Sequence, residues 1–170
     1  QQPGRQMRRR VAIKTLPHDA AEDGPAAKAL RAEARAIASL DHINIIHAYD
    51  TELSGDNPYI VMEYVDGDDL QKMVAKTGRL DFRRAADYIA QAASGLAHAH
   101  ERKLIHRDVK PANLLVDKHG TVKILDLGLA HLKHPDEAAQ KKDDDQALGT
   151  VDYLAPEQAL AGQSCDQRAD

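Results

Sequence analysis

The stretch LIHRDVKPANLLV, residues 104–116, places a base, several charges and an amide inside an apolar frame of Leu, Ile and Val. The interrupting side chains are those of His106, Arg107, Asp108, Lys110 and Asn113. Buried charges are costly unless they are paired or bound to a metal or a ligand. This segment must therefore form either a loop whose polar groups face water or a loop that holds something.

Length and composition restrict the class of protein. The chain has 170 residues, which is enough for one domain with a hydrophobic core. Its 42% hydrophobic and 29% charged residues are typical of soluble globular proteins. The net charge of −4 provides no broad basic field, so we expect no nucleic-acid partner. The single Cys165 excludes an internal disulfide and fits a reducing compartment.

The sequence shows no secretory signal and no apolar run near the roughly 18 residues that a membrane span requires. We therefore predict a cytoplasmic location and no membrane segment in the covered chain. The first residue is Gln1 rather than Met, and the sequence before Asp170 contains no signal for the end of a fold. This pattern indicates a chain that is cut at both ends.

Hydrophobic periodicity predicts strand-rich material first and helix-rich material second. The predicted strands are residues 8–16, 43–53, 58–65 and 121–130, with a turn at 54–57. The predicted helices are residues 26–40, 66–78 and 81–103. We expect Asp81 to cap the last helix, whose apolar stripe would be Ile89, Ala92, Ala93, Leu96 and Ala99. This order favours an α+β fold with two lobes and a boundary near residues 65–67.

Two groups of polar residues have a spacing that indicates chemistry. Asp108 and Asn113 share one predicted loop, and Asp126 follows on the next predicted strand. Oxygen ligands of this kind suit Mg²⁺, which binds few carboxylates together with substrate phosphates. Lys14 is a lone cation in an apolar strand, and Glu33 lies on the inner side of the following helix. A pair between Lys14 and Glu33 would aim the lysine at an anion.

Four motifs in order along the chain resemble the signature set of eukaryotic-type protein kinases. They are VAIK at 11–14, HRDVKPAN at 106–113, DLG at 126–128 and APE at 155–157. GTVDYLAPEQ at 149–158 resembles the bacterial branch of that family most closely. The resemblance implies a two-lobed kinase-like fold that is truncated at both ends. Residues 1–65 would form part of the N-lobe, and residues 66–170 would form part of the C-lobe.

The resemblance also implies the roles of the catalytic residues. Lys14 would hold the α- and β-phosphates of ATP, and Glu33 would fix its direction. Asp108 would orient the incoming hydroxyl and accept its proton. Asn113 and Asp126 would hold Mg²⁺, or Mn²⁺ as an alternative, beside the moving phosphoryl group.

Further positions would bind the nucleotide base and select the substrate. Glu63 to Val65 would form the hinge whose backbone bonds adenine, and Met62 would guard the pocket behind it. Ala12 and Leu115 would lie on the two faces of the adenine ring. Lys110 would add positive charge near the γ-phosphate, and its position resembles that in Ser/Thr-specific members.

These roles imply an ATP-dependent serine/threonine protein kinase that acts on Ser and Thr of protein substrates. Kinases of this type often regulate one another in pairs, so a second kinase domain is an expected partner. One alternative is a pseudokinase, a nucleotide-binding scaffold or regulatory module without transfer. Another is a small-molecule phosphotransferase, against which Lys110 and the APE element argue.

Other readings of single residues remain open at this point. His106 is expected to be a packed ring, because its neighbours are Leu104 and Ile105. His98 and His100 are expected to be surface or packing residues of the last predicted helix. Cys165 is expected to be only a small side chain.

The chain departs from the family pattern in several places. The glycine-rich loop would precede residue 1, and the later helices of the C-lobe would follow Asp170, which resembles the Asp that bonds the HRD backbone. Glu157 would then lack its usual Arg partner. Leu127 replaces the usual Phe of the metal-binding motif and can still fill an apolar slot. We expect the isolated fragment to have low stability and little or no activity.

Residues 131–149 are polar and without periodicity, which predicts a mobile surface segment. Thr150 resembles a structural Thr of the family, and Arg107 is of the type that pairs with an activating phosphate. We hypothesise that Asp143, Asp144 and Asp145 partly replace that phosphate. The alternative is an ordinary solvated charge run.

Overall fold

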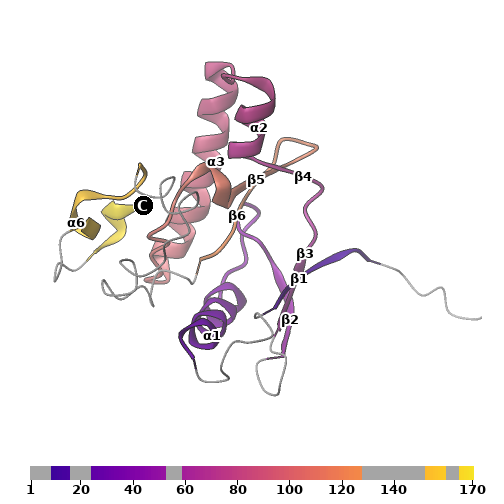
Figure 1. The fold of residues 1–170 in the computed structure, drawn as a ribbon, viewed down its shortest axis with the longest axis vertical. Coiled ribbons are helices and arrows are strands. Elements are labelled where there is room, and N and C mark those ends of the chain that lie inside the picture. The colour runs from indigo at the N-terminus through magenta and orange to yellow at the C-terminus, as the bar shows by residue number, and fades with distance from the viewer. Residues whose placement is uncertain (1–8, 16–23, 53–58, 128–151, 160–164) are drawn as a thin grey trace, which may run out of the picture.

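A computed structural model describes residues 9–15, 24–52, 59–127, 152–159 and 165–170 of the chain (Figure 1). Its first half contains β1 (Val11–Thr15), α1 (Pro25–Ala38), β2 (Ala48–Glu52), β3 (Tyr59–Glu63), β4 (Gly67–Asp69) and α2 (Leu70–Thr77). Its second half contains α3 (Phe82–Glu101), β5 (Leu114–Asp117), β6 (Val122–Ile124) and α6 (Pro156–Ala159). Two short 3₁₀ helices, η1 (Pro111–Asn113) and η3 (Gln167–Ala169), complete the set.

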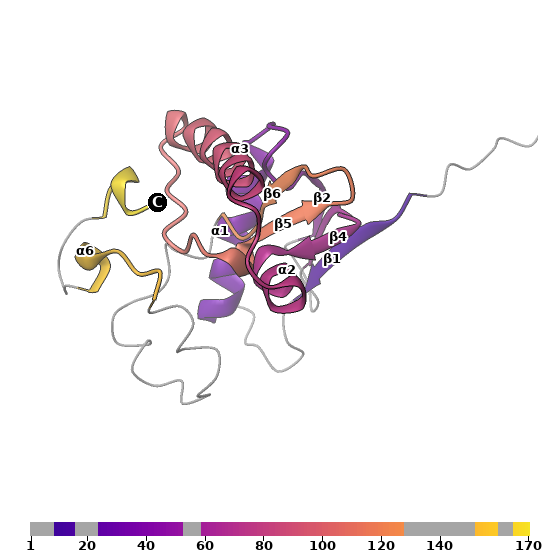
Figure 2. The same cartoon turned by 90° about the horizontal axis from the view of Figure 1, so that it is seen from above.

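The strands form two small antiparallel sheets. One has the order β1-β3-β2 and the other the order β4-β5-β6. The change from one sheet to the other falls between Glu63 and Gly67. A parallel bridge between Ile45 and Ile124 ties the turn after α1 to β6. In Figure 1, α1 lies beside the first sheet, and Figure 2 shows α2 beside β4 and α3 beside β6 of the second sheet.

The hydrophobic core runs between these parts. Its main cluster joins residues of α1, α2, α3, β5 and β6, and a smaller cluster consists of Leu30, Ala34 and Ile60. α1 contributes to both clusters, because Leu30, Ala34 and Ile37 recur at helical spacing along one side. α1 is thereby packed against β3 and against the second half of the chain.

Several predicted elements are confirmed. β1, α1 and β3 lie within the predicted ranges 8–16, 26–40 and 58–65, apart from Pro25 at the start of α1. α2 ends before Gly78, whose positive φ of 77° suits glycine. α3 begins after Asp81, whose carboxylate accepts hydrogen bonds from the N–H groups of Arg83 and Arg84.

The apolar stripe predicted for α3 is partly wrong. Ile89 is 57% exposed and Ala93 is exposed, whereas the buried side is formed by Tyr88, Ala92, Gly95, Leu96 and Ala99. The buried side includes Tyr88, whose hydroxyl accepts a hydrogen bond from Arg84 Nε at 2.6 Å. The aromatic ring can therefore be buried while its polar end is satisfied.

The strand boundaries also differ from the prediction. The strand expected over 43–53 begins only at Ala48, because the Asn44 side chain holds a turn by donating to the Val122 carbonyl at 2.9 Å. β4 and β5 were not predicted, and β6 is shorter than the expected 121–130. Strands of three and four residues are too short to show a clear alternation. The turn at 54–57 and the segment 131–149 lie outside the described residues.

Gly67 marks a close approach between β4 and β5. A Cβ atom at this position would lie 1.9 Å from the Val116 carbonyl oxygen, which is backbone and cannot move aside. We expect Gly67→Ala to lower the free energy of unfolding by about 3 kcal/mol, as measured by urea denaturation. Gln71→Ala, at an exposed position of α2, is the control. Equal stability of the two variants would contradict this close approach.

Candidate active site

Lys14 is the centre of a charged cluster that joins three distant parts of the chain. Its Nζ lies 2.8 Å from Oε1 and 2.7 Å from Oε2 of Glu33 on α1. The same Nζ lies 2.6 Å from Oδ1 of Asp126, just after β6. Strand alternation turns Ala12 and Lys14 to the half-buried side of β1, whereas Val11, Ile13 and Thr15 are exposed. The predicted pair between Lys14 and Glu33 is therefore present, and Asp126 is a further partner.

Burial and charge act in opposite directions in this cluster. Burial alone would lower the pKa of Lys14, but the carboxylates of Asp126 and Glu33 raise it above its ordinary value of 10.5. Lys14 therefore keeps its positive charge at neutral pH. Burial raises the pKa of Glu33, whose side chain is only 1% exposed, and the charge of Lys14 opposes that increase. The charge of Lys14 thus offsets part of the cost of burying the Glu33 carboxylate.

The loop after α3 places Asp108, Lys110 and Asn113 side by side. Asn113 Nδ2 donates to the Asp108 carbonyl at 2.7 Å and to Asp108 Oδ2 at 3.2 Å. Lys110 Nζ lies 2.9 Å from the same Oδ2. The Asn113 carbonyl accepts from the Leu125 N–H at 2.9 Å, which ties this loop to the residue before Asp126. The structure thus brings together the polar side chains that interrupt the apolar frame.

A buried histidine and a buried carboxylate also hold the Asp108 loop in place. His106 is 1% exposed, and its Nε2 lies 2.8 Å from the Leu125 carbonyl, which confirms that it is a packed ring. The Asp170 carboxylate accepts from the N–H of His106 at 2.8 Å and from the N–H of Arg107 at 2.6 Å. Arg107 has a φ of 64°, a left-handed conformation that is unusual for a residue other than glycine. The two bonds to Asp170 stabilise this conformation.

His100 contributes a contact that the sequence did not predict. Its Nε2 lies 2.8 Å from Asp170 Oδ2, so α3 supports the same carboxylate that holds the loop. Helical periodicity places His100 on α3 but carries no signal for a partner that lies 70 residues later.

Asp170→Asn should therefore destabilise the protein. The Asp170 side chain is 0% exposed, and an amide would direct N–H donors at groups that themselves donate. We expect a loss of about 2 kcal/mol in the free energy of unfolding, measured by denaturant titration. Asp166→Asn is the control, because the carboxylate of Asp166 is half exposed and bonds mainly Arg168. A loss no larger than that of the control would show that Asp170 does not hold the loop.

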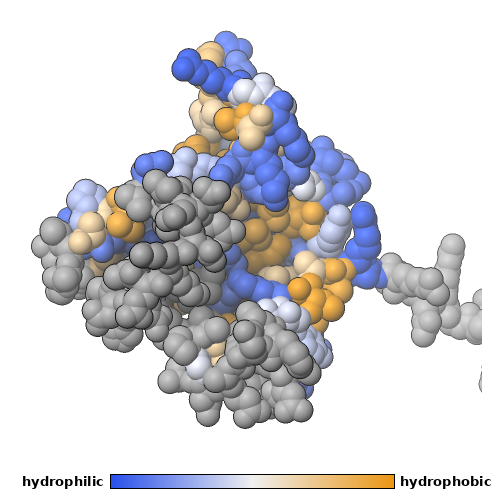
Figure 3. Space-filling model, in the orientation of Figure 1, coloured by the Kyte–Doolittle hydropathy of each residue, from blue (hydrophilic) through white to orange (hydrophobic). Residues whose placement is uncertain are grey.

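The residues expected around the nucleotide base lie between the two sheets. Ala12 pairs with Met62 across β1 and β3, and Leu115 pairs with both Asp69 and Lys123 in the second sheet. The side chains of Ala12, Met62, Val65 and Leu115 are half-buried. Figure 3 shows an orange, hydrophobic area in the centre of this face, between the β4–β5 part and the β1–β3 part.

The segment 63–65 has backbone groups that could bind the hydrogen-bonding edge of a nucleotide base. The Glu63 N–H donates to the His47 carbonyl, and the Glu63 carboxylate binds Lys123 at 2.6 Å. Within the described residues, the backbone N–H and C=O of Val65 have no hydrogen-bond partner. An adenine ring could use both groups of Val65, so the residues present fit the nucleotide.

The oxygen atoms near Lys14 fit a metal only together with another ligand. The described residues contain no group of three or more His, Cys, Asp or Glu that could hold an ion. Asn113 and Asp126 each offer one side-chain oxygen beyond the contacts already given. This donor set suits Mg²⁺ that arrives bound to phosphates rather than a resident structural metal.

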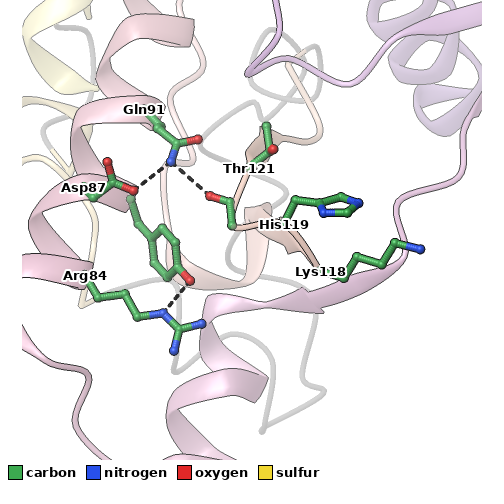
Figure 4. A pocket seen from close by; sticks show the side chains of 8 residues that line it. Arg84, Asp87, Gln91, Lys118, His119 and Thr121 are labelled. Atoms are coloured by element: carbon green, nitrogen blue, oxygen red, sulfur yellow. Dashed lines mark hydrogen bonds between the residues drawn. The ribbon is translucent and has the colours of Figure 1, made fainter.

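A polar hollow of about 520 Å³ lies elsewhere, between α3 and the turn after β5 (Figure 4). Its lining groups satisfy one another, since Gln91 Nε2 donates to Asp87 at 2.9 Å and to the Gly120 carbonyl at 3.0 Å. In Figure 4 the side chain of Lys118 points away from Arg84, so the cationic groups do not converge. We therefore assign no chemistry to this hollow.

Comparison with known proteins identifies the family to which this arrangement belongs. The family described as "Protein kinase domain" matches residues 4–170. The chain belongs to the protein kinase family. In the part of the chain that is described, no helix has the length and apolar character needed to cross a membrane.

Several similar kinases come from bacteria. Serine/threonine-protein kinase PrkC of Bacillus subtilis is 40% identical over 154 residues, which is 91% of this chain and 23% of the relative. PknB of Mycolicibacterium smegmatis is 40% identical over 168 residues, with 96% and 27% coverage. PknA of Mycobacterium tuberculosis is 41% identical over 157 residues, with 89% and 36% coverage. The chain therefore spans between about a quarter and a third of the length of these relatives.

Two further features of the kinase domain can be located. Leu127 is 2% exposed in the main core cluster, together with Ile37 of α1, so the substituted residue does fill an apolar slot. Gln158, next to the APE motif, donates to the Arg107 carbonyl at 2.7 Å and so connects that motif to the Asp108 loop. Thr150 and the acidic residues 143–145 lie outside the described residues.

Proposed function

We propose that this chain is the catalytic part of an ATP-dependent serine/threonine protein kinase. The observation that carries the proposal is the position of Lys14, whose charge is held between Glu33 and Asp126. Two carboxylates fix the position of the Lys14 ammonium group. A lysine held in this way can bind a phosphate group in a defined geometry, which a mobile surface lysine cannot. We also propose that residues 1–65 and 66–170 act as the two lobes around this site.

Each residue of the site has a distinct proposed task. Lys14 binds the nucleotide phosphates, and Glu33 keeps its ammonium group pointing at them. Asp108 orients the substrate hydroxyl and accepts its proton, while Lys110 holds the Asp108 carboxylate and adds positive charge near the transferred group. Asn113 supports Asp108 through its amide nitrogen. These assignments rest on the distances within the loop and on the family to which the chain belongs.

Asn113 and Asp126 are the residues that would hold Mg²⁺ or Mn²⁺. A divalent cation bound there would supply charge neutralisation for the transferring phosphoryl group. The backbone of Glu63 and Val65 would bind the adenine edge, with Ala12 and Leu115 against the ring and Met62 behind it. The nucleotide would thus lie between the first and the second sheet.

We further propose Ser and Thr of proteins as the substrates and the cytoplasm as the location of this part of the protein. Pairing of two kinase domains remains a prediction that no described surface supports. A pseudokinase is less favoured, because Lys14, Glu33, Asp108, Asn113 and Asp126 are all present at interacting positions.

The proposal is tested by transfer of labelled γ-phosphate from ATP, using the intact protein that contains this chain. We expect label on Ser or Thr of the protein itself and of a basic protein substrate. The label should disappear when EDTA removes divalent metal and return when Mg²⁺ or Mn²⁺ is restored. A folded protein that binds ATP and transfers no label would favour the pseudokinase instead.

A further inference from the structure

Two histidines meet where the turn after α1 packs against α3. His42 lies in this turn, and His98 lies on α3. Their ring centroids are 5.0 Å apart, and the ring planes are inclined by 32°. Neither histidine is part of the proposed active site, and the family motifs assign no role to their contact.

The hydrogen bonds of the pair require neutral rings. His42 Nδ1 accepts the N–H of Asn44 at 3.1 Å. His98 Nδ1 lies 3.3 Å from Arg102 Nη1, and a guanidinium group can only donate. Each of these ring nitrogens therefore carries no proton. Protonation there would remove an acceptor and place a donor against another donor.

The second nitrogen of His98, Nε2, is buried and has no hydrogen-bond partner among the described residues. Because Nδ1 faces the Arg102 donor, Nε2 carries the proton of the neutral ring. The His98 ring is therefore held by its contact with His42 and by Arg102 rather than by a hydrogen bond at Nε2.

The charges around His42 act on it from three elements. Burial, the neighbouring His98 and then Lys123 of β6 lower the pKa of His42, whereas Asp41 and Glu101 raise it less strongly. Lys123 is itself bound to Glu63 at 2.6 Å. The net environment favours a neutral ring.

The turn that the histidines hold connects two parts of the active site. The Ile46 N–H donates to the Ile124 carbonyl at 3.0 Å, and the Ile124 N–H donates to the Asn44 carbonyl at 2.8 Å. α1, which carries Glu33, ends just before this turn, and Asp126 follows β6 closely. Gly95 allows α3 to approach, since a Cβ there would lie 3.1 Å from the Asn44 carbonyl. The position of this turn therefore affects both carboxylates around Lys14.

The turn is fastened to α3 by an amide contact and by contacts of His42, and only the latter can titrate. Asn44 Nδ2 donates to Gln91 Oε1 at 3.1 Å, a contact between two amides that no pH change near neutrality affects. His42 packs against His98, and its Nε2 lies 3.4 Å from Ser94 Oγ. Acidification therefore weakens the attachment through His42 and leaves the amide contact in place.

We propose that His98 is a positioning residue of the kinase site, which with neutral His42 holds the turn 42–46 on α3 until protonation of His42 releases it. Release moves the Glu33 and Asp126 carboxylates relative to Lys14, so phosphoryl transfer decreases as the pH falls. The activity part of this inference rests on the proposed kinase function, whereas the packing part does not.

The first test combines imidazole NMR titration with thermal unfolding of the intact protein at pH 5.5 to 7.5. Because the folded pKa of His42 is lowered from 6.5, its stabilising contribution is complete above that pH and is lost as the pH falls toward the folded value. We expect His98→Gln to raise the pKa of His42 toward its ordinary value. The same variant should make the decrease in Tm on acidification smaller.

His119→Gln is the matched control, because His119 is exposed on the turn after β5. It should keep the pH dependence of the wild type. A second variant, His42→Asn, removes the other ring and should reduce the pH dependence as His98→Gln does. An unchanged His42 pKa in His98→Gln, or the same Tm profile in both His variants as in the control, would overturn the inference.

The second test measures phosphoryl transfer at pH 6.0 and 7.5. We expect the rate at pH 7.5 divided by the rate at pH 6.0 to be about twofold smaller in His98→Gln than in the wild type. Equal ratios with an altered Tm profile would show that the pair stabilises the fold without positioning the site. Absence of transfer at any pH would count against the kinase function, while the NMR and Tm measurements would still decide the packing part.

Discussion

Asp108→Asn is expected to reduce the rate of phosphoryl transfer about 10²–10⁴-fold, which is the range for loss of a positioned proton acceptor. The Asp108 carboxylate is held by Asn113 Nδ2 at 3.2 Å and by Lys110 Nζ at 2.9 Å. An amide of nearly the same shape can occupy this position but cannot take the hydroxyl proton. The KM for ATP should therefore change little, because the lost interaction is made in the transition state.

The measurement is a steady-state rate with labelled ATP and a basic protein substrate, together with a melting curve for each protein. Asp50→Asn, at an exposed position of β2, is the matched control and should retain the wild-type rate. If Asp108→Asn kept more than about a tenth of the wild-type rate, general-base catalysis by Asp108 would be ruled out.

Lys14→Met is expected to reduce transfer about 10²-fold or more, because a fixed positive charge at the phosphates is lost. It should also destabilise the fold, since Glu33 is 1% exposed and would keep no cation. Removing one partner of a buried pair is strongly destabilising, and partial exposure of Lys14 and Asp126 reduces the effect to about 2 kcal/mol. Urea denaturation and the transfer assay measure the two effects separately.

The pH dependence of this variant has a defined sign. Without Lys14, burial raises the pKa of Glu33 further above its ordinary value of 4.5. A raised folded pKa gives stability that is present below the unfolded value and lost as the pH rises through the folded value. Lys14→Met should therefore be more strongly destabilised at pH 8 than at pH 5, relative to the wild type.

A double variant separates the structural role of Lys14 from its catalytic role. Lys14→Met with Glu33→Gln removes the buried charge along with its partner, so most of the stability should return. Activity should stay low, because the cation proposed to bind the α- and β-phosphates is missing. Recovery of transfer in the double variant would show that Lys14 acts only by supporting Glu33.

Some contacts of this site could be predicted from the sequence, and others could not. Strand alternation placed Lys14 on an inner side, and helical spacing placed Glu33 between Leu30 and Ile37, so their contact could be expected. The approach of Asp126 to the same Nζ could not, because it joins residues that lie 112 positions apart in the chain. Long-range packing of this kind leaves no periodic signal in the chain.

The elements that were missed have physical causes of the same type. β5 is four residues long and follows the Asp108 loop directly, so its alternation merges with the apolar frame around that loop. The exposed Ile89 was placed in the core because hydrophobicity alone cannot tell it from Tyr88, which is buried through its hydroxyl contact with Arg84. The apolar pattern therefore predicts Ala92, Leu96 and Ala99 correctly and misses the aromatic residue with a polar end.

The left-handed Arg107 has a consequence for the order in which the protein folds. The N–H of Arg107 is held by a carboxylate 63 residues later in the chain, so the correct loop conformation requires closure of a long segment. Closing such a segment costs entropy before its contacts form, and contacts of high sequence separation therefore tend to form late. The Asp108 loop should thus mature only when residues 165–170 have docked. During synthesis, Lys14 and Glu33 would meet well before the loop around Asp108 reaches this conformation.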